Sequence, residues 1–333
     1  MDRNSIKDVA KLANVSTATV SHVINQTRFV AESTQEKVYQ AMRELNYQPN
    51  SAARSLRSRK TNTIGLIVPF VATDITNYFF MSVANGIEDG LKKRGYKLIL
   101  SNSNEDVKTE KQQIQDFNTQ LIDGLIIAPV LSKADHYKRL FNDYYPVVFI
   151  DRMLDENIAD VILVDNKGGT YEAVTAFIKN GHRRIGMIGG TLGITTSDDR
   201  YESFHQAVSD YAEENVEGMA KISSPSFEEG YRLTEQLIQE GITAIFVGNN
   251  VMAIGAMAAL QNAGIKIPED MAIIAYDNYE WMEITQPPLS TVSQPAFELG
   301  RKSVERLFER MEGDQSPFDI TLLPTDLIIR SSH

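Results

Sequence analysis

The sequence contains no cysteine, so disulfide bonds and thiolate sites are excluded, as is typical of proteins in the reducing cytoplasm. It has no apolar run near the roughly 20 residues that a membrane helix requires. Its first residues are polar, unlike those of a secretory signal. We therefore expect a cytoplasmic protein with no membrane-spanning segment.

Catalytic signatures are also lacking. The five histidines are scattered without metal-ligand spacing, and neither a G-x-x-x-x-G-K-[ST] phosphate loop nor an H-E-x-x-H motif occurs. The glycines of "GGTLGI" (189–194) do not have dinucleotide-binding spacing, and no activated nucleophile is evident. We expect no enzyme, no cofactor and no metal site; nucleotide binding would test for a dehydrogenase or kinase.

The charge of the chain is unevenly distributed. The net charge is −11, yet residues 1–60 contain ten Lys and Arg against five Asp and Glu. This segment therefore carries +5, which leaves −16 for residues 61–333. A protein with this charge distribution would bind DNA phosphates through its basic N-terminal segment, whereas its acidic body would be repelled by them. Two independently soluble surfaces are the alternative explanation of the same charges.

Residues 1–48 have the spacing of three short helices. An apolar stripe runs from Ile6 to Ala13, and "NVS" (14–16) interrupts it with residues that favour turns and N-caps. After a second helix, a third is expected to begin at "STQE", where Ser33 and Glu36 have capping-box spacing. Two short helices joined by a tight turn, with a third closing the core, form a helix-turn-helix arrangement.

The second helix, which Ser16 can cap, has an apolar and a polar face. Val20, Val23 and Ile24 fall at i, i+3 and i+4 and are expected to face the core. The other face carries small or polar side chains, so it could enter a DNA major groove closely. The residues expected to face base edges are Thr17, Ala18, Ser21 and His22. A three-helix domain that binds another protein is the alternative.

The segment "YQPNSAARSLRSRKT" (47–61) suggests a short basic helix. Pro49 ends the preceding helix, and Asn50 can cap a new one that runs to about Arg57. About nine residues do not hold a helix alone in water, so we expect it to form only against a partner helix or DNA. Leu56 stands among cations, which suits insertion into a minor groove. Packing of Leu56 on its own domain is the alternative.

The N-terminus resembles that of the lactose/galactose repressor family of bacterial regulators, over the run "IKDVAKLANVSTATVSHVIN…STQEKVYQAMRELNYQPNSAARSLRSRKTNTIGLIVP". The match is long and specific, and it continues through the body. The resemblance implies that the polar face of the second helix reads bases and that Leu56 is the wedge of a hinge helix. Family members usually carry arginine where this chain has His22, so the family's operator bases do not carry over.

We expect the DNA contacts to come from the three-helix headpiece, residues 1–48, and from the hinge, residues 49–60. Residues 61–333 would form the effector-binding and dimerisation core. The expected DNA-binding residues are Ser5, Thr17, Ala18, Thr19, Ser21, His22, Asn25, Ser33, Tyr47, Asn50, Ala53, Arg54 and Leu56.

The body is expected to have an α/β fold. Short β-branched runs such as "TIGLIV" (63–68) and "VVFI" (147–150) alternate with amphipathic helical stretches, which predicts parallel sheets covered on both faces. Seven or more such units exceed one lobe, and the family resemblance implies two doubly wound lobes like those of periplasmic binding proteins. We expect an N-lobe of about 61–160 and 293–320, and a C-lobe of about 161–292 and 321–333.

Ligands of open parallel sheets bind at the carboxyl ends of the strands, and polar residues follow several predicted strands here. Carboxylates and arginines offer fixed hydrogen-bond geometry to hydroxyls, and aromatic rings pack on the C–H faces of sugars. Each of these residues could equally cap a loop or a helix, so the constellation is a stronger signal than its members.

The family resemblance selects among these residues. "DITNYFF" resembles its N-x-F-F motif, "IDR" its Asp-Arg, "RYESF" its R-x-x-G-F and "YDN" its F-D-D. Asn250 stands where an Asp is common, and Ser203 replaces the usual Gly. The missing carboxylate makes the pocket less anionic, so a sugar, a sugar phosphate or a sugar acid could be the effector. The expected contacts are Asp74, Phe79, Asn102, Arg152, Arg200, Asn250 and Asp277.

We interpret the sequence as that of a DNA-binding transcriptional regulator, a repressor, that acts as a homodimer. Paired headpieces would read the two halves of a pseudo-palindromic double-stranded operator. An effector in the interlobe cleft would control operator binding, provided that it binds two lobe arrangements with different affinity. A carbohydrate-binding protein without a gene-regulatory role is the alternative, and a gel shift on operator DNA would separate the two.

Overall fold

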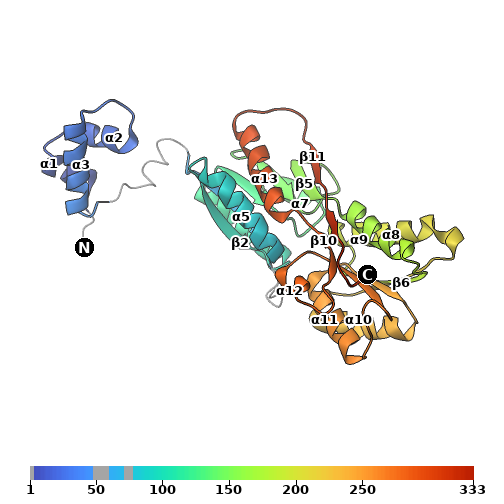
Figure 1. Cartoon of the computed structure of the whole chain (residues 1–333). Helices are drawn as coiled ribbons and strands as arrows, with labels where there is room; N and C mark the ends of the chain where they lie inside the picture. Colours follow the sequence, from blue (N-terminus) through green and yellow to red (C-terminus); the bar gives the residue numbers. More distant parts are fainter. Residues whose placement is uncertain (1–3, 48–59, 71–77) are drawn as a thin grey trace. The chain divides into compact units, whose positions relative to one another are not determined.

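The computed structural model describes residues 4–47, 60–70 and 78–333, and the chain divides into one unit up to Thr61 and a second from Asn62 to His333. The first unit contains α1 (Ile6–Leu12), α2 (Thr17–Asn25) and α3 (Glu32–Glu44), labelled in Figure 1. All three helices contribute to one small core, in which Val9, Val20 and Val38 are fully buried. The predicted helix-turn-helix headpiece is confirmed.

The start of α3 differs from the prediction. The helix begins at Glu32 with Ala31 as its N-cap, so the expected capping box of Ser33 and Glu36 is wrong. Ser33 lies inside the first turn, and the Ala31 carbonyl accepts the first backbone hydrogen bonds of the helix. The carboxylate of Glu32 stands in the first turn, where the helix dipole favours negative charge without a side-chain cap.

The second unit contains two sheets, each of six strands among the described residues. The N-lobe sheet has the order β11-β5-β4-β3-β1-β2 and is parallel throughout. The C-lobe sheet has the order β12-β10-β9-β8-β6-β7, in which only β10 and β12 pair antiparallel. The strands are β1 (Thr63–Val68), β2 (Lys97–Asn102), β3 (Gly124–Ile127), β4 (Val147–Ile150), β5 (Asp160–Val164), β6 (Arg184–Gly189), β7 (Glu217–Ile222), β8 (Ala244–Val247), β9 (Ala272–Tyr276), β10 (Ser290–Ser293), β11 (Ile320–Leu323) and β12 (Asp326–Ile328).

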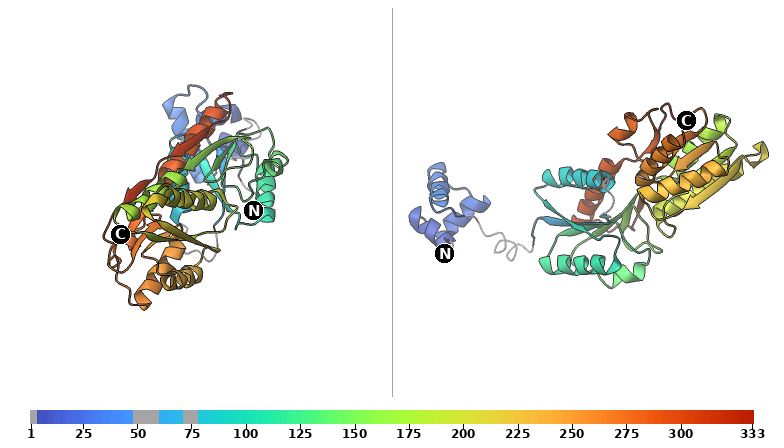
Figure 2. Two further views of the ribbon diagram at one scale, coloured as in Figure 1. Left: turned by 90° about the vertical axis from the view of Figure 1, so that its right-hand side faces the viewer. Right: turned by 90° about the horizontal axis from the view of Figure 1, so that it is seen from below.

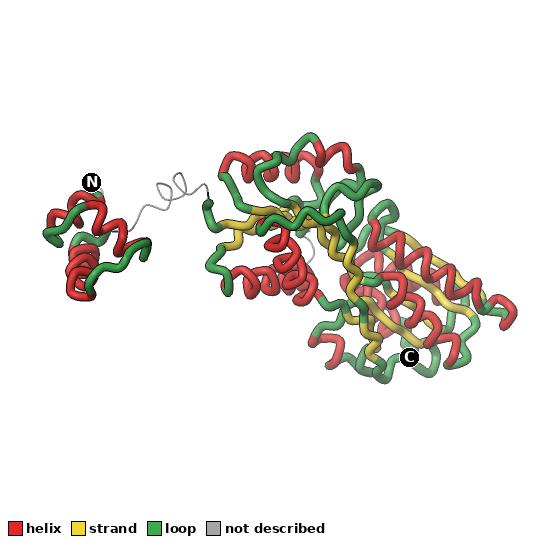
Figure 3. The backbone as a smooth tube through the Cα atoms, turned by 90° about the horizontal axis from the view of Figure 1, so that it is seen from above, coloured by secondary structure: helices red, strands yellow, loops and turns green. Residues whose placement is uncertain are grey.

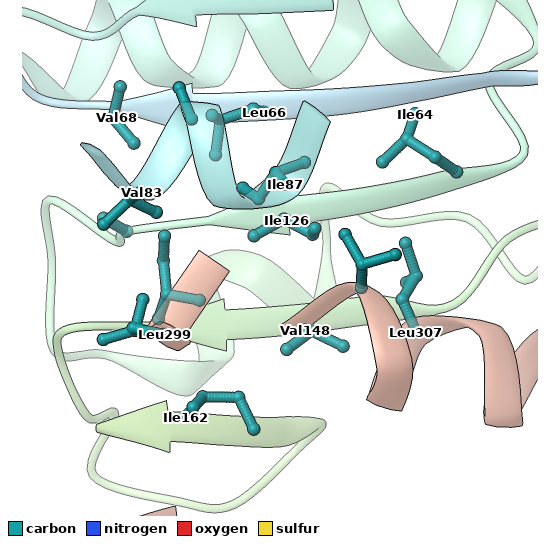
Figure 4. Close-up of a cluster of buried hydrophobic side chains, with 14 of the residues drawn as sticks. Ile64, Leu66, Val68, Val83, Ile87, Ile126, Val148, Ile162, Leu299 and Leu307 are labelled. Carbon is teal, nitrogen blue, oxygen red and sulfur yellow. The ribbon is translucent and has the colours of Figure 1, made fainter. Parts of the chain in front are cut away.

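Helices cover both faces of each sheet, as Figures 2 and 3 show. In the N-lobe, α5 and α13 pack on one face, where Leu66, Val83 and Leu299 meet (Figure 4), and α6 and α7 pack on the other. In the C-lobe, α8 and α9 oppose α10 and α11. The helices of this unit are α5 (Tyr78–Lys92), α6 (Val107–Gln120), α7 (Ala134–Lys138), α8 (Asn166–Lys179), α9 (Thr195–Asp210), α10 (Phe227–Gln239), α11 (Asn250–Asn262), α12 (Glu280–Glu283) and α13 (Ala296–Met311), with a 3-10 turn at Ala212–Glu214.

Within the described residues, the chain passes between the two lobes three times, after β5, β10 and β11. The first and the third of these crossovers lie one strand later than predicted. Strand β5 pairs with β4, and β11 pairs with β5, so both belong to the N-lobe sheet, although the prediction ended this lobe at about 160 and 320. Asp160 is not a linker residue: it is 1% exposed and forms ion pairs with Arg306 and Arg310 of α13. Helix α13 lies in the 293–320 stretch assigned to the N-lobe, and it packs on α5.

Helices α5 and α13 cross so closely that their glycines are required. A Cβ on Gly86 would lie 2.0 Å from the carbonyl oxygen of Phe297, and one on Gly300 would lie 2.1 Å from that of Val83. A methyl group at either position would therefore meet rigid backbone, and the two helices would have to separate.

Gly86→Ala is expected to lower the free energy of unfolding of the core by roughly 1–3 kcal/mol, the usual cost of overpacking. Thermal unfolding followed by circular dichroism measures the change. Glu88→Ala, on the exposed side of the same helix, is the matched control and should unfold at the wild-type temperature. Equal unfolding temperatures for the two variants would show that the helix crossing tolerates a methyl group.

Candidate functional site

Helix α2 presents the face on which the sequence places base contacts. Its N-cap is Ser16, whose Oγ accepts a hydrogen bond from the backbone amide of Thr19 at 3.0 Å. Val20 and Val23 are buried beneath the helix, so the opposite face cannot turn inward. Thr17 and Ala18 are exposed at the N-terminal turn, the part of a recognition helix that approaches base edges.

The remaining polar residues of α2 are held by local hydrogen bonds. His22 Nδ1 lies 2.8 Å from Thr27 Oγ1, which fixes the ring and leaves Nε2 as its other polar atom. Asn25 Nδ2 donates to the carbonyl oxygen of Ser21 at 2.8 Å. Thr19 Oγ1 lies 2.8 Å from Ser16 Oγ, so this predicted contact already helps to cap the helix.

The other predicted DNA contacts of the headpiece are dispersed. Ser5 is the N-cap of α1 and donates from Oγ to Asp8 Oδ2 at 2.7 Å, Ser33 is exposed on α3, and Tyr47 packs partly against the core. The remaining four lie outside the described residues, as does most of the predicted hinge helix: they are Asn50, Ala53, Arg54 and Leu56.

His22→Ala is expected to weaken operator binding about tenfold to a hundredfold, because one side-chain contact to a base edge contributes roughly 1–3 kcal/mol. Fluorescence anisotropy on an operator obtained by binding-site selection measures this. Gln40→Ala, exposed on α3, is the control and should bind like wild type. If both variants keep wild-type affinity, His22 does not contact the bases.

The second candidate site lies at the carboxyl ends of the strands, where residues of both lobes converge. Asp151 and Arg152 follow β4, Asn250 begins α11, and Asp277 follows β9. Arg200 reaches the same place from α9. These are the places from which open parallel sheets bind ligands.

Asp277 is the centre of the C-lobe part of the site. It is 7% exposed and adopts a left-handed backbone with a φ of 70°. Asn250 Nδ2 donates to its Oδ2 at 2.6 Å, and Gln294 Nε2 donates to its Oδ1 at 2.5 Å. The carboxylate is thus held by amides from α11 and from the segment between β10 and α13, where the chain crosses between the lobes for the second time. Gln294 was missed because a lone glutamine between a strand and a helix has no sequence signature.

Arg200 is held on three sides. Its guanidinium carbon lies 3.5 Å from the ring centre of Tyr276, Nε donates to Asn166 Oδ1 at 2.9 Å, and one terminal nitrogen donates to the carbonyl oxygen of Gly248 at 2.7 Å. Asn166, which the sequence did not single out, lies at the start of α8, where the chain enters the C-lobe. The arrangement fixes a cation in direction as well as in position.

The N-lobe part of the site contains a buried ion pair. Both terminal nitrogens of Arg152 donate to Glu105, one of them at 2.9 Å, and one also donates to the carbonyl oxygen of Pro129 at 3.2 Å. Asp151 lies beside Arg152, with 3.6 Å between Oδ2 and Nε. Sequence reasoning selected Asn102 in this stretch and missed Glu105, although an acidic residue after a predicted strand was a usable signal.

Burial and charge act against each other in this cluster. Burial raises the pKa of Asp151, and the guanidinium groups of Arg152 and Arg200 oppose that rise. For Arg152, burial alone would lower the pKa, but hydrogen bonds and charge from Glu105 and the charge of Asp151 hold it above its ordinary value. The cluster therefore holds carboxylate and guanidinium groups together in a site that is largely shielded from solvent.

Aromatic side chains from both lobes line a pocket of about 380 Å³ beside this cluster. Phe79 of α5 lines it together with Asp277 and Gln294, and the rings of Tyr78 and Tyr279 stand 5.2 Å apart across the two lobes. A larger pocket of about 660 Å³ lies between α8 and α9, but it contains none of the predicted effector contacts.

One predicted effector contact has another position, and a second is not described. Asn102 closes the turn after β2: its Oδ1 accepts from the backbone amides of Phe70 and Asn104 at 2.8 and 2.9 Å. Asp74 lies outside the described residues. The described part of the chain contains no group of three or more metal-ligand side chains, and none of its helices is long and apolar enough to cross a membrane.

Comparison with known proteins gives two family matches. Residues 5–50 match the bacterial regulatory proteins of the lacI family, and residues 174–333 match the periplasmic binding protein-like domain. Among curated relatives, the HTH-type transcriptional repressor PurR of Aliivibrio salmonicida and the ribose operon repressor of Haemophilus influenzae are each 36% identical to the chain. Each alignment covers 98% of this chain and 98% of the relative.

Solved structures are similar over the whole chain. A lac repressor dimer bound to operator and the anti-inducer ONPF has a TM-score of 0.88 and 27% identity, with 99% of both chains covered. A LacI family transcriptional regulator from Enterococcus faecium with bound ribose has a TM-score of 0.72 and 30% identity, and the match covers 81% of this chain and 98% of that one.

Proposed function

The chain belongs to the LacI family of DNA-binding transcriptional repressors, and from this premise we propose that it binds operator DNA as a homodimer under the control of a small neutral sugar, a pentose such as ribose. The alternative of a carbohydrate-binding protein without a gene-regulatory role is wrong, because the relatives that match over 98% of the chain are repressors. The predicted absence of enzymatic activity agrees with this family.

One observation carries the choice of a sugar: the aromatic pocket and the charged cluster beside it, which meet at Asp277, together offer carboxylate, amide and guanidinium groups. The Asp277 carboxylate can accept hydrogen bonds from neighbouring hydroxyl groups of the sugar, and its amide partners can donate to them. Arg200 donates from a fixed direction. Phe79 and the two tyrosines supply apolar faces for C–H groups. The ribose-bound relative supports a ligand of this size.

The homodimer follows from the geometry of reading DNA. One headpiece contacts few bases, whereas a two-fold pair reads both halves of a pseudo-palindromic operator. The lac repressor relative is a dimer on operator DNA. In this proposal Leu56 of the hinge reaches the minor groove between the half-sites, with Arg54 among the cations that contact phosphates, and the protein acts in the cytoplasm beside the chromosome.

Two measurements on the full-length protein test the proposal. A gel shift with a selected operator should show specific binding that changes when ribose is added. A thermal-shift series with ribose, adenine and a sugar acid should show stabilisation by ribose alone, because a ligand at 100 times its dissociation constant adds roughly 2.7 kcal/mol. Stabilisation by adenine instead would contradict the sugar assignment while leaving the repressor function intact.

A further inference from the structure

We propose that Glu105 determines effector specificity: its carboxylate occupies the guanidinium of Arg152 and thereby excludes effectors that carry a phosphate or carboxylate group. This inference rests on the proposed sugar-controlled repressor and adds to it the residue that selects a neutral ligand over an anionic one. Without Glu105, an arginine at the carboxyl end of a strand could bind an anion, because its planar guanidinium group matches the geometry of phosphate and carboxylate oxygens.

The geometry of the ion pair supports this role. The side chain of Arg152 is 10% exposed and that of Glu105 is 31% exposed, so the pair is closed on the arginine side and open to water on the glutamate side. Both terminal nitrogens of Arg152 are used by Glu105. The buried Nε donates no hydrogen bond to any described residue and faces Asp151, with 3.6 Å between Nε and Oδ2.

The loop of Glu105 does not need the ion pair in order to fold. Asn102 closes the turn through its amide oxygen, and Gln113 Nε2 donates to the carbonyl oxygen of Asn102 at 2.5 Å. Asp106 caps α6, with Oδ1 accepting from the amide of Thr109 at 2.7 Å. Glu105 itself has a φ of 55°, a left-handed backbone that glutamate adopts rarely. These contacts shape the loop, and the ion pair is an additional feature.

The charges around the site also favour a neutral ligand over an anionic one. Arg152 and Arg200 are the cations of the cluster, and Glu105, Asp151 and Asp277 are carboxylates. With Glu105 in place, carboxylates outnumber guanidinium groups, so an added anion would be repelled or would have to displace Glu105. A neutral sugar meets neither obstacle, because its hydroxyls can bond to either kind of group. Removing the charge of Glu105 would leave Arg152 without its main ion-pair partner.

The test is isothermal calorimetry of D-ribose and D-ribose 5-phosphate binding to the full-length protein. Wild type is expected to prefer ribose, and Glu105→Gln should shift the affinity ratio toward ribose 5-phosphate at least tenfold. Glu105→Asp keeps the charge and should keep the wild-type preference. Glu156→Gln, which removes an exposed carboxylate paired with Lys138 in the same lobe, is the control and should bind like wild type.

Each outcome decides the question. An unchanged ratio in folded Glu105→Gln would overturn the proposal, as would a wild type that prefers ribose 5-phosphate, although the latter would leave a sugar effector in place. Equal loss of both ligands would show that Glu105 only positions Arg152, which also overturns it. Glu105→Ala provides a second neutral variant should the first fail to fold. A wild type that binds neither sugar would refute the ribose assignment in the proposed function, and this inference with it, while leaving the repressor function intact.

Discussion

Asp277→Asn is expected to lower effector affinity by about a hundredfold or more and to leave operator affinity without effector unchanged. Asparagine tolerates the left-handed backbone at this position, so the substitution removes the charge with little strain. It also replaces one of the two oxygens that accept from Asn250 and Gln294 with an NH2 donor, so both amides then compete with the ligand for the remaining oxygen. Each charge-assisted hydrogen bond contributes roughly 1.5–3 kcal/mol.

The measurement is calorimetric titration with ribose, followed by a gel shift without ribose. Asp326→Asn, an exposed position on the edge strand β12, is the matched control and should behave like wild type in both. The two functions can separate because the headpiece is a compact unit apart from the core. A variant that loses operator binding and also unfolds at lower temperature would show that Asp277 supports the fold instead.

Operator affinity is expected to fall by about a thousandfold between 50 and 200 mM salt, because protein cations displace counterions from the phosphates. Residues 1–60 carry +5, and two copies in a dimer double that charge, whereas the acidic remainder of the chain offers the DNA no attraction. Fluorescence anisotropy across a salt series gives the slope of log affinity against log salt.

Two results would set the limits of this expectation. Ribose affinity, measured in the same buffers, should change little, because a neutral ligand displaces no counterions. A nearly flat slope for the operator would mean that the basic segment does not meet the phosphates, and would place the DNA contacts on another surface.

The headpiece was predictable because its signals are local. The turn at 14–16, the Ser16 cap and the apolar spacing from Val20 to Ile24 all lie within eleven residues, and each acts on its nearest neighbours. The start of α3 was missed because Glu32 in the first turn can replace a side-chain cap, and nothing in the spacing of "STQE" reveals this. Local patterns place helices well and their first residues less well.

The alternation of strands and helices also determined the fold class, since buried β-branched runs require cover on both faces. It did not determine which strand closes which sheet. Strand β11 joins β5 across more than 150 residues, and what anchors that edge is Asp160 with Arg306 and Arg310, a pairing that no local pattern predicts.

The sequence by itself determined the classes of side chain in the cleft, because strand ends and family motifs identify Arg152, Arg200 and Asp277. Only the tertiary structure decided how they are used: Glu105, 47 residues from Arg152, neutralises the first, and Gln294, 17 residues from Asp277, holds the last. Hydrogen bonds depend on distance and direction in space. A partner from another element therefore leaves no trace in the spacing of residues, and it is found only when the chain has folded.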